Sequence, residues 1–168
     1  MITVCKPPFE VNTPISRYGV RIFMAGSIEM GIAENWQDRV QSKLAGVDKL
    51  VATEIVLYNP RRDDWNPSWA QSIDNPQFNE QVTWELEHLI QSDIILMYFD
   101  GNTKSPITLL ELGLHAHRGE NVIIFCPDNF WRKGNVEMVA DYYGLQLFSN
   151  EDDWMNAVVD RILDLRLM

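Results

Sequence analysis

Residues 93–113 read DIILMYFDGNTKSPITLLELG, and this stretch decides the fold. An apolar run comes first, followed by a short polar loop. Ser105-Pro106 then predicts the start of a helix that runs to Arg118, because proline is favoured in the first helical turn and serine just before it. A strand that is apolar throughout suits a parallel sheet covered on both faces. The stretch therefore predicts a buried strand, a loop and a helix of an α/β fold.

Similar apolar runs occur elsewhere in the chain and alternate with helix-like segments. The other predicted strands are VRIFMA at 20–25, EIVLY at 54–58, NVIIFC at 121–126 and LQLF at 145–148. Alternation of this kind is typical of right-handed crossovers between parallel strands. We therefore predict one domain over residues 1–168, a three-layer α/β/α sandwich with a five-stranded parallel sheet of the flavodoxin or Rossmann-like kind.

Helical periodicity places three further helices. Residues 32–45 put apolar side chains at four-residue steps, residues 78–91 put Gln81, Glu85 and His88 on one polar face, and a last helix follows the acidic residues 150–153 and ends at about Arg166. The apolar stripe of the first of these helices consists of Ile32, Trp36, Val40 and Leu44.

Composition excludes several classes of protein. The 168 residues are 46% apolar and 23% charged, and no apolar run reaches the roughly 18 residues of a membrane span. The beginning of the chain lacks the pattern of a secretion signal, so we expect a cytoplasmic protein without membrane contact. A net charge of −10 argues against binding to nucleic acid polymers. Two cysteines, Cys5 and Cys126, are too few for a metal cluster, and we expect neither a metal nor a cofactor.

Ligands of open parallel sheets bind at the carboxyl ends of the strands, near the point where strand order reverses. Four segments are expected there: Gly26-Ser27-Ile28, residues 59–69, residues 100–105 and residues 127–135. A glycine followed by a hydroxyl can bind an anion, although AGSI also fits a plain tight turn.

Glu111 lies within the apolar helix start TLLELG. An ionised carboxylate is costly to bury unless it is paired or hydrogen-bonded. Either the helix turns Glu111 to solvent, or the side chain has a functional role.

Four motifs together resemble the nucleoside 2-deoxyribosyltransferase family and the related 2'-deoxynucleoside 5'-monophosphate N-glycosidases. They are FMAGSI at 23–28, QVTWE at 81–85, SDIILMYF at 92–99 and TLLELG at 108–113, within a resemblance that spans about residues 20–145. It implies cleavage of the N-glycosidic bond of 2'-deoxynucleosides or their 5'-monophosphates, with transfer to another base or to water. It also implies a homo-oligomer that binds small molecules.

The resemblance assigns roles to two glutamates. Glu111 matches the family's catalytic nucleophile, which forms a covalent glycosyl-enzyme, and Glu85 matches an acidic residue that contacts or protonates the departing base. The better-known members have aspartate at the position of Glu85.

Departures from the transferase pattern bear on the substrate. Ser105 stands where transferases have aspartate, as in the nucleotide N-hydrolases, and Ser27 also matches the hydrolase version. The two serines favour a 5'-monophosphate. Asp100 is an alternative source of the missing carboxylate.

Other residues of the four segments are candidates for binding. Arg61, Arg62, Arg132 and Lys133 either bind phosphate or, for the first pair, form salt bridges with the neighbouring aspartates 63 and 64. Trp65, Trp69 and Trp131 are candidates for stacking on a base or for a subunit interface, and Asn135 matches a loop asparagine that reaches a neighbouring subunit's site. The competing hypothesis is a non-catalytic nucleotide-binding or sensing module on the same fold.

Overall fold

The computed structural model describes residues 1–10, 15–28 and 33–167 of the chain. Its centre is a parallel sheet of six strands in the order β1-β3-β2-β4-β5-β6. The strands are β1 (Ile2–Cys5), β2 (Val20–Gly26), β3 (Ile55–Tyr58), β4 (Ile94–Tyr98), β5 (Val122–Phe125) and β6 (Gln146–Phe148). The predicted parallel α/β sandwich is thus confirmed, and the five predicted strands are all present.

The sixth strand, β1, is the one that the sequence analysis missed. It pairs with β3 at the edge of the sheet, in the register Ile2 to Ile55. Three of its four residues are only partly buried. An edge strand this short carries no continuous apolar run, so its pairing with β3 is a tertiary contact that local sequence does not signal.

In the part of the chain that the structure describes, five α-helices flank the sheet. They are α1 (Trp36–Ala45), α2 (Pro76–Gln91), α3 (Pro106–His115), α4 (Lys133–Tyr143) and α5 (Glu151–Leu167), with 3-10 turns η2 (Asp48–Leu50) and η3 (Ala116–Asn121). The helix predicted to reach Arg118 becomes 3-10 after His115. Ile32, expected in the first helix, lies outside the described residues. None of the helices within the described ranges is both long and apolar enough to cross a bilayer.

Helix α4 was not predicted from the sequence. Only Val136 and Ala140 are fully buried along it, while Met138 and Tyr142 are exposed. Because its buried face is this narrow, the helical periodicity is weak in the sequence.

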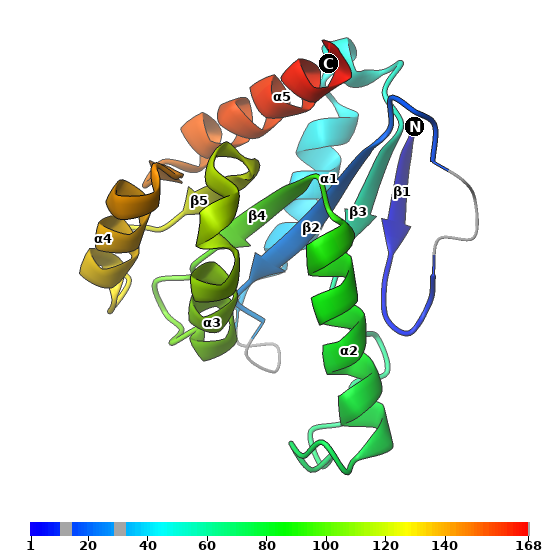
Figure 1. Cartoon of the computed structure of the whole chain (residues 1–168), viewed down its shortest axis with the longest axis vertical. Coiled ribbons are helices and arrows are strands. Elements are labelled where there is room, and N and C mark those ends of the chain that lie inside the picture. The colour runs from blue at the N-terminus through cyan, green and yellow to red at the C-terminus, as the bar shows by residue number, and fades with distance from the viewer. Residues whose placement is uncertain (11–14, 29–32, 168) are drawn as a thin grey trace.

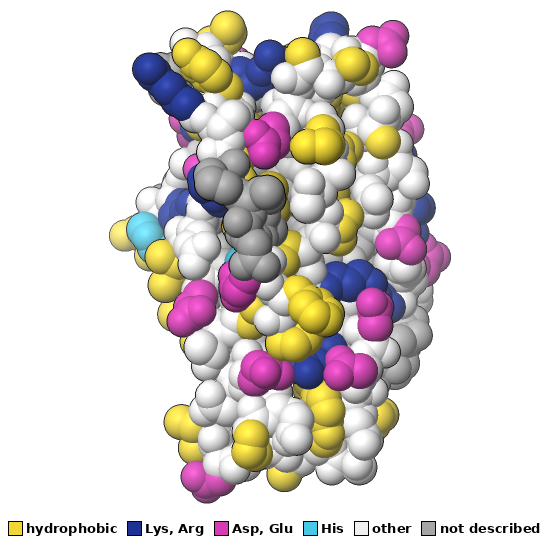
Figure 2. Space-filling model, turned by 90° about the vertical axis from the view of Figure 1, so that its right-hand side faces the viewer, with side chains coloured by type: hydrophobic (Ala, Val, Ile, Leu, Met, Phe, Trp, Pro, Cys, Tyr) yellow, Lys and Arg dark blue, Asp and Glu magenta, His cyan; other side chains and the backbone are white. Residues whose placement is uncertain are grey.

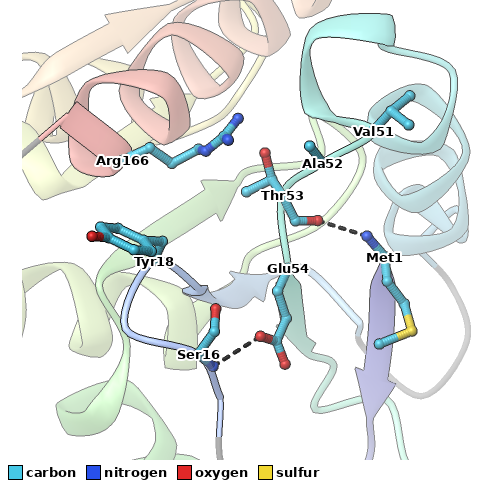
Figure 3. A pocket seen from close by; sticks show the side chains of 8 residues that line it. All are labelled: Met1, Ser16, Tyr18, Val51, Ala52, Thr53, Glu54 and Arg166. Atoms are coloured by element: carbon cyan, nitrogen blue, oxygen red, sulfur yellow. Dashed lines mark hydrogen bonds between the residues drawn. The ribbon is translucent and has the colours of Figure 1, made fainter.

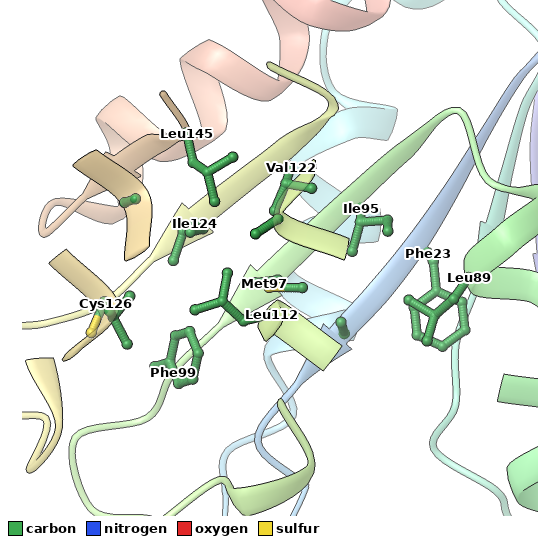
Figure 4. Packing of buried hydrophobic residues seen from close by; sticks show 14 of the residues in the cluster. Phe23, Leu89, Ile95, Met97, Phe99, Leu112, Val122, Ile124, Cys126 and Leu145 are labelled. Carbon is green, nitrogen blue, oxygen red and sulfur yellow. The ribbon is translucent and has the colours of Figure 1, made fainter. Parts of the chain in front are cut away.

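Two cores lie on opposite faces of the sheet. Alternate residues of β4 point to opposite faces, so Ile95 and Met97 pack with α2, α3 and α4, whereas Ile94 and Leu96 pack with α1 and α5. Figure 1 shows α2, α3 and α4 in front of the sheet and α1 behind it. Figure 4 shows the first core, in which Leu112 of α3 lies close to Met97.

Strand order reverses between β2 and β4. The order without β1 is that of flavodoxin-like sheets, whose ligands bind at this reversal. Gly26 ends β2 here, and a Cβ on it would lie 2.7 Å from the carbonyl oxygen of Tyr98 and 2.6 Å from the Trp36 ring. The close approach of β2, β4 and α1 therefore requires glycine at this position.

Candidate functional site

Three buried hydroxyl groups meet at the reversal point. Ser27 follows β2, and Thr103 and Ser105 follow β4; each side chain is at most 4% exposed. The Thr103 hydroxyl lies 3.0 Å from the Ser27 Oγ and 2.8 Å from the Ser105 Oγ, and the two serine hydroxyls are also hydrogen-bonded to each other. The Asp100 backbone N–H donates to the Ser27 Oγ at 2.9 Å. We call Ser27, Thr103 and Ser105 the hydroxyl cluster.

Ser105 was predicted to cap α3, and its side chain does not do so. Its backbone is left-handed, with φ 47° and ψ 51°, and its side chain makes no capping hydrogen bond. The hydroxyl turns to the hydroxyl cluster instead. Backbone conformations of this kind cost free energy in residues other than glycine and concentrate at functional sites.

Asp100 lies beside the hydroxyl cluster. Its side chain is 8% exposed, and one carboxylate oxygen accepts the Asn102 backbone N–H at 2.8 Å. This contact holds the start of the loop between β4 and α3. Ile28, one residue after Ser27, is partly buried at the same edge.

Two glutamates from neighbouring helices form the second part of the site. Glu111 of α3 is 7% exposed, and the alternative in which α3 turns it to solvent is excluded. Burial raises the pKa of the Glu111 carboxyl well above its usual value, and the negative charge of Glu85 raises it further. Burial raises the pKa of Glu85 to about 7, against the lowering effect of a hydrogen bond from Gln81.

Like charges this close in a region poor in water do not both ionise readily. Because the pKa of each carboxyl is raised, the pair resists full ionisation. One carboxylate and one carboxylic acid side by side are the combination that a nucleophile and a general acid require.

The face of α2 that carries Glu85 packs against the protein interior. Gln81 and His88 on this face are 5% and 1% exposed. The predicted grouping of the three side chains is correct, and the expected polar face is a buried one. Gln81 donates from its amide nitrogen to Glu85 Oε1 at 2.8 Å and to the Pro60 carbonyl at 2.9 Å.

The two arginines after β3 differ in their partners. Arg62 is paired with Asp64 at 2.6 Å and Glu80 at 2.8 Å, so the salt-bridge alternative holds for it. Arg61 is partly buried and donates to the Glu34 carbonyl at 3.1 Å. Among the described residues no carboxylate lies within ion-pairing distance of Arg61, and its Nε has no hydrogen-bond partner. Burial lowers the pKa of its guanidinium.

The three tryptophans of the loops differ in exposure. Trp65 and Trp69 are partly buried and pack edge to face, with ring centroids 5.2 Å apart. Trp131 is 52% exposed and donates to the Lys104 carbonyl at 3.0 Å. The guanidinium of Arg132 lies over the Trp131 ring.

The segment after β5 contributes exposed and ion-paired side chains. Lys133 pairs with Asp128 and, at 3.9 Å, with Glu137. Asn135 is exposed on the first turn of α4.

Two surface pockets lie elsewhere. One of about 610 Å³ is at the opposite, amino-terminal edge of the strands, and Figure 3 shows Tyr18, Glu54 and Arg166 around it. The other, of about 830 Å³, is lined by residues 3–10, which include most of β1, and by Asp63 and Asp64. Figure 2 shows acidic, basic and hydrophobic side chains interspersed on the side of the molecule that carries β1. Neither pocket is lined by Glu85, Glu111 or the hydroxyl cluster.

Thr103 was not singled out from the sequence, whereas Gln81 was placed on one face with Glu85 but was not assigned to the site. Thr103 joins Ser27 to Ser105, and its position in the loop after β4 was the available signal. Gln81 contacts Glu85, and a four-residue spacing on a helix is the signal for such a pair. Among the described residues, no three His, Cys, Asp or Glu side chains lie together as a metal site would require.

Comparison with known proteins gives a family and a fold. A family model described as "Nucleoside 2-deoxyribosyltransferase like" matches residues 19–130. A conserved protein from Enterococcus faecalis V583 has a similar crystal structure, with a TM-score of 0.58 and 18% sequence identity. The match covers 85% of this chain and 99% of that protein, and at this identity it shows the fold alone. No curated protein matches the chain by sequence.

Proposed function

The chain belongs to the nucleoside 2-deoxyribosyltransferase-like family, and from this premise we propose that it cleaves the N-glycosidic bond of 2'-deoxynucleosides or their 5'-monophosphates. Membership of the family suggests an enzyme of the deoxyribosyltransferase kind. The observation that carries the finer proposal is the pair Glu85 and Glu111, which lie close enough for the charge of one to raise the pKa of the other. The sugar is transferred to another base or to water.

The reaction proceeds in two steps. In the first, a carboxylate oxygen of Glu111 attacks the anomeric carbon, the carbon–nitrogen bond breaks, and its electron pair goes to the base. Glu85 delivers its proton to that base, which would otherwise leave as a poor anionic leaving group. In the second, water or another base attacks the anomeric carbon and releases Glu111, while Glu85 takes up the proton of the attacking group.

The test is incubation of the protein with a panel of deoxynucleosides and their monophosphates, with free base measured by chromatography. Release by the wild type and its loss in Glu111→Gln support the proposal. Binding of a nucleotide without release of base from any substrate contradicts it and favours the sensing module.

The hydroxyl cluster supports a 5'-phosphate on the substrate. Ser105 directly precedes α3 and Ser27 directly follows β2, and their hydroxyls meet beside the amino end of α3, which favours an anion. Arg61, with no carboxylate partner among the described residues, is a source of positive charge at the same edge of the sheet. A dianion bound here is screened from the protein's net negative charge at distances beyond ~8 Å.

Replacing Ser105 by Ala tests whether the hydroxyl cluster binds a 5'-phosphate of the substrate. We expect kcat/KM for a monophosphate to fall by roughly 10–150-fold, because a hydrogen bond to a charged group is lost, with little change for the unphosphorylated nucleoside. Ser92→Ala is the matched control, because Ser92 is also buried but lies at the carboxyl end of α2. Equal losses on both substrates, or a wild type that prefers the nucleoside, would contradict the proposed binding of a 5'-phosphate.

An exposed apolar face on α3 supports a homo-oligomer. Ile107, Leu110 and Leu114 are 59%, 60% and 48% exposed and follow helical spacing along one side of the helix that carries Glu111. A second copy of the chain can bury this face in a two-fold interface, since the same apolar stripe is then supplied twice. This face replaces the half-buried Trp65 and Trp69 as the expected interface.

Light scattering tests the assembly. We expect at least twice the 19.5 kDa of one chain at micromolar concentration, and a smaller species for Leu110→Asp, which places a charge in the interface. Val51→Asp serves as the control, because Val51 is 71% exposed but lies at the opposite edge of the sheet. A wild type of 19.5 kDa would refute the homo-oligomer.

The paired glutamates predict the pH dependence of kcat/KM. As pH rises through about 7, the pair begins to lose its first proton, and the rate should increase, because the singly protonated pair includes the reactive form in which Glu111 is ionised and Glu85 keeps the proton. At higher pH the last proton is lost, no general acid remains, and the rate should fall. A profile that is flat from pH 6 to 9 would be inconsistent with this pair.

A further inference from the structure

Gln81 is bound on one side of its amide group and unpaired on the other. Its Nε2 carries two hydrogens and donates both, one to Glu85 Oε1 at 2.8 Å and one to the Pro60 carbonyl at 2.9 Å. Its Oε1 is buried and has no hydrogen-bond partner within residues 1–10, 15–28 and 33–167. The side chain as a whole is 5% exposed.

The orientation of this amide follows from its neighbours. The Pro60 carbonyl can only accept hydrogen bonds, and the Glu85 oxygen that Gln81 contacts also accepts, so that the proton of the acid is on the other oxygen of Glu85. Both must face the nitrogen of Gln81, and Oε1 must therefore face the other way. The result is a buried acceptor of fixed direction, and it belongs to the same amide group that donates to the proposed general acid, Glu85. A buried acceptor without a partner costs free energy, and such an atom in a folded protein calls for an explanation such as a partner from outside the chain.

We propose that Gln81 determines base specificity: its amide nitrogen holds Glu85, and its amide oxygen accepts a hydrogen bond from the exocyclic amino group of the base. This inference rests on the proposed function. In adenine the amino group lies beside the ring nitrogen N7, so one base edge offers an acceptor for the proton of Glu85 and a donor for Gln81.

A base with an oxo group in place of the amino group fits Glu85 and Gln81 poorly. In hypoxanthine and guanine the position beside N7 carries a carbonyl oxygen. Two acceptors then face each other, and the oxygen of Gln81 stays unpaired. Sites built to hydrogen-bond a substrate N–H discriminate strongly against analogues that lack it. The amide of Gln81 cannot rotate to present its nitrogen without losing the contacts to Glu85 and Pro60.

The experiment compares 2'-deoxyadenosine with 2'-deoxyinosine, or their monophosphates, which differ in this one group. We expect the wild type to favour the amino base by at least about tenfold in kcat/KM. In Gln81→Met we expect both rates to fall, because Glu85 loses its donor, and the ratio to move toward one. Any intrinsic difference between the two leaving groups cancels when the ratios of the two proteins are compared.

Gln37→Met is the matched control. Gln37 is 1% exposed, and its amide has no hydrogen-bond partner among the described residues, but it lies on α1 and makes no hydrogen bond to either glutamate. We expect it to leave the ratio unchanged. Equal losses on both substrates in Gln81→Met would reduce Gln81 to a positioning residue and overturn the proposal, as would a wild type that prefers the oxo base.

Binding of free bases separates this inference from the proposed function. Calorimetry with Glu111→Gln measures adenine and hypoxanthine without turnover. Tighter binding of adenine, abolished by adding Gln81→Met, supports base reading even if no substrate is cleaved. Equal binding of the two bases by Glu111→Gln itself overturns it, whether or not Gln81→Met folds. Absence of base release from every substrate would refute only the proposed function.

Discussion

Replacing Glu111 by Gln should reduce base release by at least about 10⁴-fold, because removal of a catalytic nucleophile leaves only binding and electrostatic contributions. The measurement is single-turnover release of base, with a 2-fluoro-2-deoxy substrate as a second readout. Slow deglycosylation of that substrate should trap a sugar adduct on Glu111, detectable by peptide mass spectrometry. An adduct on another residue, with Glu111→Ala still active, would rule out this assignment.

The same substitution should stabilise the fold at neutral and higher pH. The pKa of Glu111 is higher in the folded state than in the unfolded state. Ionisation of this carboxyl therefore lowers the free energy of unfolding as pH rises from about 4.5 through the folded-state pKa. Glutamine does not titrate. The Tm of Glu111→Gln should therefore exceed that of the wild type by a margin that grows between pH 4 and pH 8. A lower Tm for the variant at every pH would mean that the carboxyl is structurally required.

Replacing Glu85 by Gln should reduce release of ordinary bases by about 10²–10⁴-fold, the typical contribution of a general acid. The loss should be much smaller for 7-methyl-2'-deoxyguanosine, whose base already carries a positive charge and leaves without a proton. The measurement is the ratio of the two rates in wild type and variant. The variant should also lose the fall in rate at high pH, because no acid remains to be deprotonated.

Glu87→Gln is a suitable control for the acid, because Glu87 is exposed on α2, two residues after Glu85. We expect it to leave both rates unchanged. An equal loss on the two substrates in Glu85→Gln would mean that Glu85 binds the substrate and does not protonate the base.

Much of the architecture could be predicted from local sequence. The runs that became β2, β3, β4 and β5 could be recognised because each is mainly apolar and buried on both faces, whereas the short run LQLF became the partly buried edge strand β6. The motif TLLELG marked Glu111 because a glutamate is conspicuous among leucines. The edge strand Ile2–Cys5 and helix α4 escaped prediction, since a half-exposed edge and a narrow buried face leave little periodicity.

By itself the sequence determined the layered α/β fold, the segments at the carboxyl ends of the strands and the identity of the two glutamates. Only the tertiary structure decided how those groups behave. The raised pKa values of Glu85 and Glu111 depend on burial between two helices, and the hydroxyl cluster depends on the pairing of β2 with β4. The free oxygen of Gln81 depends on the Pro60 carbonyl, 21 residues away in the chain. Desolvation and hydrogen bonding across such separations are set by packing, which residue order along one segment does not encode.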